Sequence, residues 1–197
     1  ALHALGRPEL VPVIQNARTY LAKMQYAGGG AYGGGMGYDA DQGRPYTDLS
    51  NSYMAYEAMR LTQDVEDLRA AGEPKADLDW AAAQQFLGQL QNLKSVNTNA
   101  YVSDSADDAG GFAYTPGAGP AVTNADGKVT LRSYGSMTYA GLLALIYAQV
   151  DANDPRVQAA KDWASRHWTL DENPGMGQEG LYYFFNVLTK SLAAAGD

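Results

Sequence analysis

The sequence predicts an all-α protein in which about three helical hairpins form a half-ring, with a small β-hairpin as an insertion. Two observations lead to this prediction. Six segments space their apolar residues as helices do, and they alternate between an amphipathic, charged type and a nearly uncharged type. This alternation is expected where charged helices form an outer layer, apolar helices form an inner layer, and neighbouring repeats complete the core.

The most apolar segment, 133–150, contains no charged residue and has apolar side chains on every face of a helical wheel. A helix of this kind must be buried on all sides. The first half of the segment carries Ser, Tyr, Gly and Thr, and no basic residues flank its end, which argues against a membrane span. We therefore expect it to be the central helix of the domain.

The other helices follow from apolar spacing and from signals at their ends. Pro8 and Pro12 precede a helix that ends near residue 25, and Asp48 or Ser50 is expected to cap a helix over about 49–63. Further helices are predicted over about 78–93, 155–168 and 178–195. The glycine tract at 28–38 is predicted to be a loop.

The longest connection, 94–132, is predicted to be an insertion with small elements of its own, because structureless loops of that length are uncommon. It contains Asp104-Ser-Ala-Asp107-Asp108-Ala-Gly-Gly-Phe112-Ala-Tyr114. Val and Thr then alternate around Asp126-Gly127, which predicts a β-hairpin. We interpret 1–197 as one domain with repeats at about 8–63, 78–150 and 155–195.

Both helix types align internally, which predicts a structural repeat. The amphipathic helices share an alanine, an aromatic residue three positions later, and Gln or Trp five positions after that: Ala17, Tyr20 and Gln25; Ala83, Phe86 and Gln91; Ala160, Trp163 and Trp168. The apolar helices align over 52–56, 135–139 and 179–183.

This pattern resembles the repeat of α/α-toroid proteins of the prenyltransferase and squalene-cyclase class. The matching residues are an aromatic-Leu pair, a Gln, and then Gly with an aromatic residue: Tyr20-Leu21, Gln25 and Gly30-Ala-Tyr32, and Phe86-Leu87, Gln91 and a delayed Gly110-Gly111-Phe112. The C-terminal half looks most like uncharacterised bacterial members. Three helical pairs are fewer than a complete ring of this family has, so we expect the seam to be closed by another protein chain, a second copy or a missing segment.

Charge and composition restrict the partners. The net charge is −8, and no basic stripe is present, so a nucleic-acid partner is not expected. The absence of cysteine excludes thiolate metal sites. No cofactor is predicted. The sequence begins at Ala1 rather than Met, from which we expect a processed and exported protein of the periplasm or the extracellular space.

The resemblance implies two candidate catalytic residues. Squalene-type cyclases protonate an alkene with an Asp in an Asp-x-Asp-Asp motif, and the nearest match places Asp107 and Asp108 in that role. The stretch from Asp104 to Asp108 has one extra residue and lacks the following Thr. Adjacent carboxyl groups that are buried together separate their pKa values. A solvated turn or a cation site is the alternative interpretation.

The resemblance also bears on metal binding. Protein prenyltransferases hold zinc with Asp, Cys and His, whereas this chain has no Cys, and its two histidines lie on separate segments. No metal site is therefore predicted. His3 is placed in the terminal segment. His167 takes a core position of the repeat, where packing or hydrogen bonding is expected.

Aromatic residues are the candidate ligand-binding set. They are expected to hold a hydrophobic, isoprenoid-like or sugar-like ligand, with core packing as the alternative. The set comprises Tyr56, Phe112, Tyr114, Tyr139 and Tyr183, together with Ser136. We expect the site where 107–114 meets Ser136 and Tyr139.

The predicted function is a helical-repeat binding or interaction module whose inner helices hold a ligand or partner, without zinc prenyltransferase or standard cyclase chemistry. Whether the chain is an enzyme stays open. One alternative is a terpene-cyclase-like enzyme with an Asp general acid. Another is a glycan-active enzyme in which Asp107 or Asp108 faces one of three C-terminal carboxylates, namely Asp171, Glu172 and Glu179.

Overall fold

The computed structural model describes residues 1–39, 43 and 45–196. Within these residues the fold is mainly α-helical, with one two-stranded antiparallel sheet, so the mainly-α prediction with a small hairpin is confirmed. The helices are α1 (Val11–Met24), α2 (Leu49–Leu61), α3 (Trp80–Leu90), α4 (Gly135–Tyr147), α5 (Pro155–Arg166) and α6 (Leu181–Ala195). The strands are β1 (Ala121–Thr123) and β2 (Val129–Leu131).

Local capping sets the start of three helices. The side chains of Asp48, Asp79 and Asp154 accept hydrogen bonds from backbone N–H groups in the first turns of α2, α3 and α5. This confirms Asp48 as the cap of the second helix. The third helix is shorter than predicted, because Gln91 has extended backbone and forms a β-bridge with Phe112.

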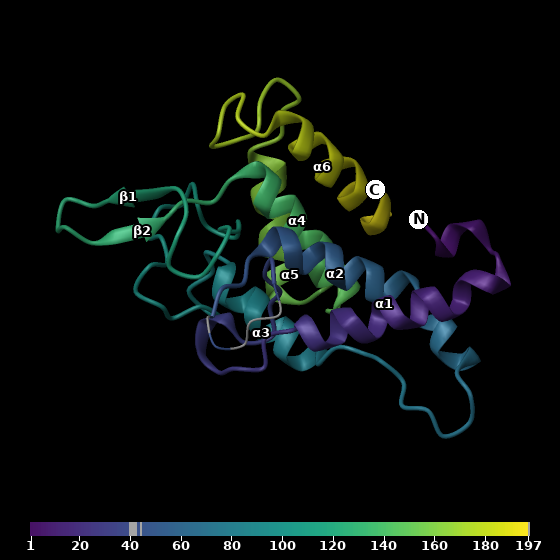
Figure 1. Ribbon diagram of the computed structural model, residues 1–197. Coiled ribbons are helices and arrows are strands. Elements are labelled where there is room, and N and C mark those ends of the chain that lie inside the picture. The colour runs from purple at the N-terminus through teal and green to yellow at the C-terminus, as the bar shows by residue number, and fades with distance from the viewer. Residues whose placement is uncertain (40–42, 44, 197) are drawn as a thin grey trace.

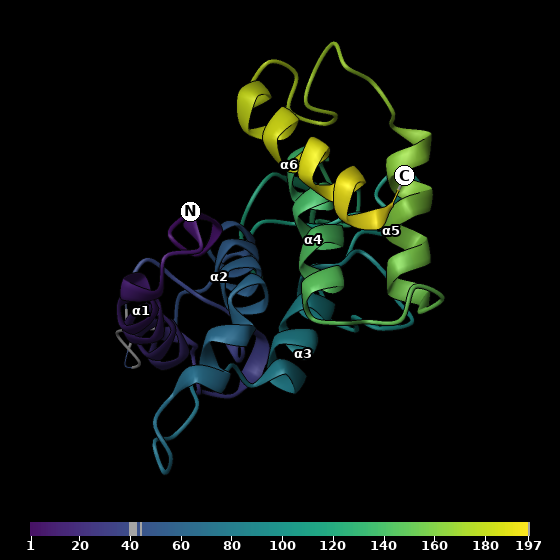
Figure 2. The same cartoon turned by 90° about the vertical axis from the view of Figure 1, so that its right-hand side faces the viewer.

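Helix α4 lies in the centre of the fold and packs against α2, α5 and α6 (Figures 1 and 2). Residues 135–145 are all buried, as the apolar composition of this segment predicted. The ring of Phe112 lies against Gly141, where an added Cβ would stand 2.5 Å from the ring. In the described part of the chain, every helix is too short or too polar to span a bilayer.

The predicted hairpin is also confirmed. Strands β1 and β2 pair antiparallel with Ala121 opposite Leu131 and Thr123 opposite Val129. Gly127, in the connecting turn, has a φ of 80°, which glycine adopts without strain. The hairpin extends away from the helices (Figure 1).

One arrangement of contacts, here called the glutamine joint, occurs twice, and the side chain of one glutamine forms each copy. The side-chain amide of each glutamine donates to the carbonyl of a loop glycine and to a carbonyl at the start of the next amphipathic helix. These acceptors are Gly34 (2.9 Å) and Asp79 (3.0 Å) for Gln25, and Gly110 (2.9 Å) and Arg156 (2.8 Å) for Gln91. The sequence alignment of the two glutamines is therefore matched by identical contacts.

Both joints require glycine. Gly34 and Gly110 have φ values of 90° and 94°, and a Cβ on either would stand about 2 Å from a helix carbonyl, at 2.1 Å from Ala82 O and 2.2 Å from Ala159 O. Side chains other than hydrogen cannot fit there. The following glycines, Gly35 and Gly111, lie against Phe86 and Trp163.

The joints also correct two parts of the sequence alignment. The N–H of Met36 donates to Ser52 Oγ at 2.9 Å, and the N–H of Phe112 donates to Thr138 Oγ1 at 3.2 Å. Ser52 therefore corresponds to Thr138, not to Gly135, and the apolar helices shift by three residues. In the same way, residues 110–112 correspond to residues 34–36, whereas the sequence alignment matched them to residues 30–32. The long glycine tract offers several local matches, and only contacts between distant segments select one.

Candidate functional site

Asp108, one of the two predicted catalytic residues, is 1% exposed and bonded on all sides by the protein. Its carboxylate accepts hydrogen bonds from Ser103 Oγ (2.6 Å), the Ser133 N–H (2.9 Å) and Arg132 Nε (3.2 Å). Its backbone carbonyl accepts from Ser133 Oγ at 2.7 Å. This arrangement fastens the 103–111 loop to the segment that enters α4.

Asp107, its neighbour, lies on the surface at the end of α5. Its carboxylate is 2.9 Å from His167 Nε2, and its backbone carbonyl accepts from Trp163 Nε1 at 2.8 Å. The hydrogen bond with His167 lowers the pKa of Asp107, and the positive charges of Arg132 and Arg166 act in the same direction. The His167 ring stacks on Trp163 with ring centres 4.1 Å apart, which fits the expected packing and hydrogen-bonding role of His167.

Phe112 and Ser136 lie in the interior. Phe112 is fully buried under Gly141, and the N–H of Ser136 donates to Asn173 Oδ1 at 2.8 Å. Ser136 Oγ also accepts from Asn173 Nδ2 at 3.2 Å. The expected site was where 107–114 meets Ser136 and Tyr139, whereas the structure places Phe112 against Thr138 and Gly141 of α4, in a packed interior.

Tyr56 and Tyr183 lie on two different helices, α2 and α6. Tyr56 is fully buried and donates to the carbonyl of Gly34 at 2.9 Å, and burial raises its pKa. Tyr183 lies against Tyr53, with ring centres 6.5 Å apart. Within the described residues, its buried hydroxyl has no hydrogen-bond partner of acceptable geometry.

Tyr114 lies at the N-terminal end of α2, where its carbonyl accepts from the Leu49 N–H, and it does not line the cleft that Tyr139 lines. Its hydroxyl is 3.1 Å from the hydroxyl of Tyr38 and 3.5 Å from Ser50 Oγ. Ser50 in turn donates to Asp48 Oδ1 at 2.7 Å. Burial is the largest cause that raises the pKa of Tyr114, so this phenol stays protonated at neutral pH.

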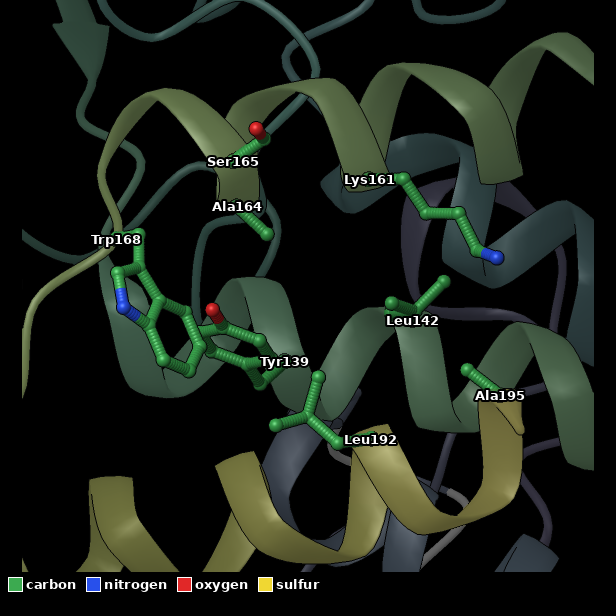
Figure 3. A pocket seen from close by; sticks show the side chains of 8 residues that line it. All are labelled: Tyr139, Leu142, Lys161, Ala164, Ser165, Trp168, Leu192 and Ala195. Atoms are coloured by element: carbon green, nitrogen blue, oxygen red, sulfur yellow. The ribbon is translucent and has the colours of Figure 1, made fainter. Parts of the chain in front are cut away.

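Tyr139 lines an open cleft of about 420 Å³ between α4, α5 and α6. Figure 3 shows side chains of all three helices pointing into it. They are Tyr139 and Leu142 of α4, Lys161, Ala164 and Ser165 of α5, and Leu192 and Ala195 of α6. Trp168, which follows the end of α5, completes the lining. Burial raises the pKa of Tyr139 to about 12, so its hydroxyl is protonated at neutral pH.

The cleft has a regular lining. Residues 161, 164 and 165 of α5 and residues 192 and 195 of α6 lie on one face of their helices, and Trp168, just beyond the end of α5, continues the lining. Seven residues of helix correspond to a length of about 10 Å. Small residues, Ala164, Ser165 and Ala195, lie between the larger ones, and Trp168 remains 54% exposed.

Sequence reasoning found one residue of this cleft, Tyr139, and missed the others. The helical spacing of 161, 164, 165 and 168 was the available signal. It was obscured because α5 has a second face, with Val157, Ala160 and Trp163, that is more apolar and is buried.

Neither a metal centre nor a known relative identifies the site. No group of three or more His, Asp or Glu side chains in the described residues is arranged to hold a metal ion. Comparisons of the chain with models of protein families, with curated proteins and with solved structures find no match.

Proposed function

We propose that this chain is a helical-repeat interaction module of the α/α-toroid type, in which α2, α4 and α6 are inner helices and α1, α3 and α5 are outer helices. Its cleft between α4, α5 and α6 binds an amphipathic helix of the outer type from another polypeptide. The duplicated glutamine joint supports the repeat, because Gln25 and Gln91 make equivalent contacts to equivalent positions.

The lining of the cleft is the observation that carries this proposal. Two helix faces border it over about two turns, with small residues in the middle and Trp168 at one end. Side chains of a third helix fit into grooves of this kind, which is the usual way in which an amphipathic helix binds a helical protein.

The opposite side of the fold supplies a second argument. The repeat equates Tyr20 of α1 with Phe86 of α3 and Trp163 of α5. Phe86 and Trp163 are buried under the loops at Gly35 and Gly111, whereas Tyr20 is 60% exposed. Helix α1 thus presents an aromatic residue of the outer type on its surface, as expected at an open seam.

The polar contacts of the acidic loop favour binding over acid catalysis. The Asp108 carboxylate already accepts hydrogen bonds from three protein groups, and Asp107 is held by His167 at the surface. A general acid that protonates an alkene needs a proton aimed at a dry cavity. The expected isoprenoid ligand is an alternative occupant of the same apolar cleft.

A labelled peptide that copies residues 8–25, an outer-type helix, tests the proposal by fluorescence anisotropy. We expect binding with a Kd of about 10 μM, and at least a tenfold loss for Ala164→Arg, which places a long charged side chain in the cleft. The matched control is Ala81→Arg, at an exposed alanine of α3, which should bind normally. Thermal unfolding confirms that both variants are folded.

Two results would contradict the proposal. Equal binding of the peptide by Ala164→Arg and by the unchanged chain would place the contact elsewhere. Binding of geranylgeraniol, lost in Ala164→Arg, without any binding of the peptide would identify the cleft as an isoprenoid site. Light scattering then shows whether a second copy supplies the helix.

A further inference from the structure

Two exposed tyrosine rings stack against each other near the N-terminal end of α2, and neither lines the α4–α5–α6 cleft. Tyr38 and Tyr46 stack with ring centres 6.1 Å apart and an angle of 24° between their planes. They are 71% and 46% exposed. Large aromatic rings that are left exposed together are a common feature of binding surfaces.

A connected set of hydroxyl groups borders these rings. The Tyr38 hydroxyl is 3.1 Å from that of Tyr114, and Tyr46 stacks on Tyr38 beside them. Ser50 Oγ links Tyr114 to the carboxylate of Asp48, which is fully buried. The carboxylate accepts from Ser50 and orients the hydroxyl network, whose outer members still have free donor or acceptor capacity.

The combination of flat rings and hydroxyl groups selects one class of ligand. A sugar ring has an apolar C–H face that stacks on an aromatic ring and hydroxyl groups around its edge that exchange hydrogen bonds. A quaternary ammonium ion needs rings arranged around it as a cage, whereas the Tyr38 and Tyr46 rings are nearly parallel, with an angle of 24° between their planes. The net charge of −8 and the buried Asp48 disfavour acidic ligands.

We propose that Tyr38 and Tyr46 form a stacking platform for a neutral saccharide chain, whose hydroxyl groups hydrogen-bond to Tyr114 and Ser50. This site is independent of the helix-binding cleft, so either proposal can fail without the other. Exposed aromatic stacking typically gives modest affinity, and we expect a Kd of about 0.1 to 1 mM for a hexasaccharide.

Calorimetric titration with cellohexaose and with maltohexaose tests this proposal and separates β-linked from α-linked glucans. We expect one of the two to bind, with about a tenfold loss for Tyr38→Ala and for Tyr46→Ala. Tyr38→Phe should keep most of the affinity, because it retains the ring and loses one hydroxyl. Tyr20→Ala, which removes an equally exposed tyrosine from α1, is the control and should bind normally.

Circular dichroism of each variant establishes that it is folded before it is titrated. Failure of both hexasaccharides to bind to the folded, unchanged chain would overturn the proposal. Binding that survives Tyr38→Ala and Tyr46→Ala would do the same. Binding of choline, lost in these two variants, without saccharide binding would identify a cation site instead.

Discussion

The two sides of α5 have opposite characters. On one side, Trp163 is 2% exposed, donates to the carbonyl of Asp107, and stacks with His167. On the other side, Ala164 and Trp168 border an open apolar cleft, and Trp168 is 54% exposed. One short helix thus has a packed, hydrogen-bonded face and a face that borders an open cleft.

This difference shows that residue types capable of acid–base chemistry can serve to hold the fold together. The acidic loop contains Asp107 and Asp108, yet most of their polar atoms hold the protein together. The cleft is lined largely by alanine, leucine and aromatic side chains. Stability measurements on matched residues of the two sides separate these roles.

The largest expected difference is between two tryptophans five residues apart. Trp163→Ala removes a buried ring and an N–H donor, so the free energy of unfolding should fall by about 4 kcal/mol. Trp168→Ala removes a mostly exposed ring and should change it by less than about 0.5 kcal/mol. Urea unfolding measures both, and similar losses for the two variants would contradict the comparison.

A smaller contrast is expected within the acidic pair. Asp108→Ala leaves the Ser133 N–H and the hydroxyl of Ser103 without their buried acceptor, which should cost about 3 kcal/mol. Asp107→Ala removes an exposed carboxylate and should cost less than about 1 kcal/mol. Thermal unfolding tests this. A stable Asp108→Ala protein would show that the buried carboxylate is not the anchor of the loop.

The smallest expected effect is the pH dependence of the Asp107 contact. The His167 hydrogen bond lowers the pKa of Asp107 in the folded state, so its contribution is fully present above the unfolded pKa of about 4 and is lost as the pH falls through the lower folded value. The carboxylate is 64% exposed, which limits the effect to less than about 0.5 kcal/mol. The difference in stability between Asp107→Asn and the unchanged chain should therefore shrink from about pH 6 to pH 3. A difference that stays constant over this range would exclude the contact as its source.

Much of the helical framework could be predicted because its signals are local. The apolar composition of 133–150 indicated the buried helix α4, Asp48 capped α2 as expected, and Asp126-Gly127 marked the hairpin turn. The alignment of Gln25 with Gln91 was matched by equivalent contacts. The helix, cap and turn signals each depend on residues within a few positions of one another, whereas the glutamine contacts reach as far as 65 positions along the chain.

The candidate sites were much less predictable. Tyr139 of α4, Leu192 of α6 and Trp168, which follows α5, line one cleft but come from three separate segments. Tyr114 reaches Tyr38 across 76 positions of sequence. The register between the inner helices also required the contacts of Met36 and Phe112.

The sequence alone therefore determined which segments are helical, which helix is the most deeply buried, and that Gln25 and Gln91 occupy matching positions. The tertiary structure decided which face of each helix is covered and where aromatic rings remain exposed. It also decided that the Asp108 carboxylate accepts its hydrogen bonds from groups of the protein itself. The physical reason is that helix formation and capping depend on interactions within one or two turns. Burial and ligand access depend on the packing of segments that are far apart in the chain.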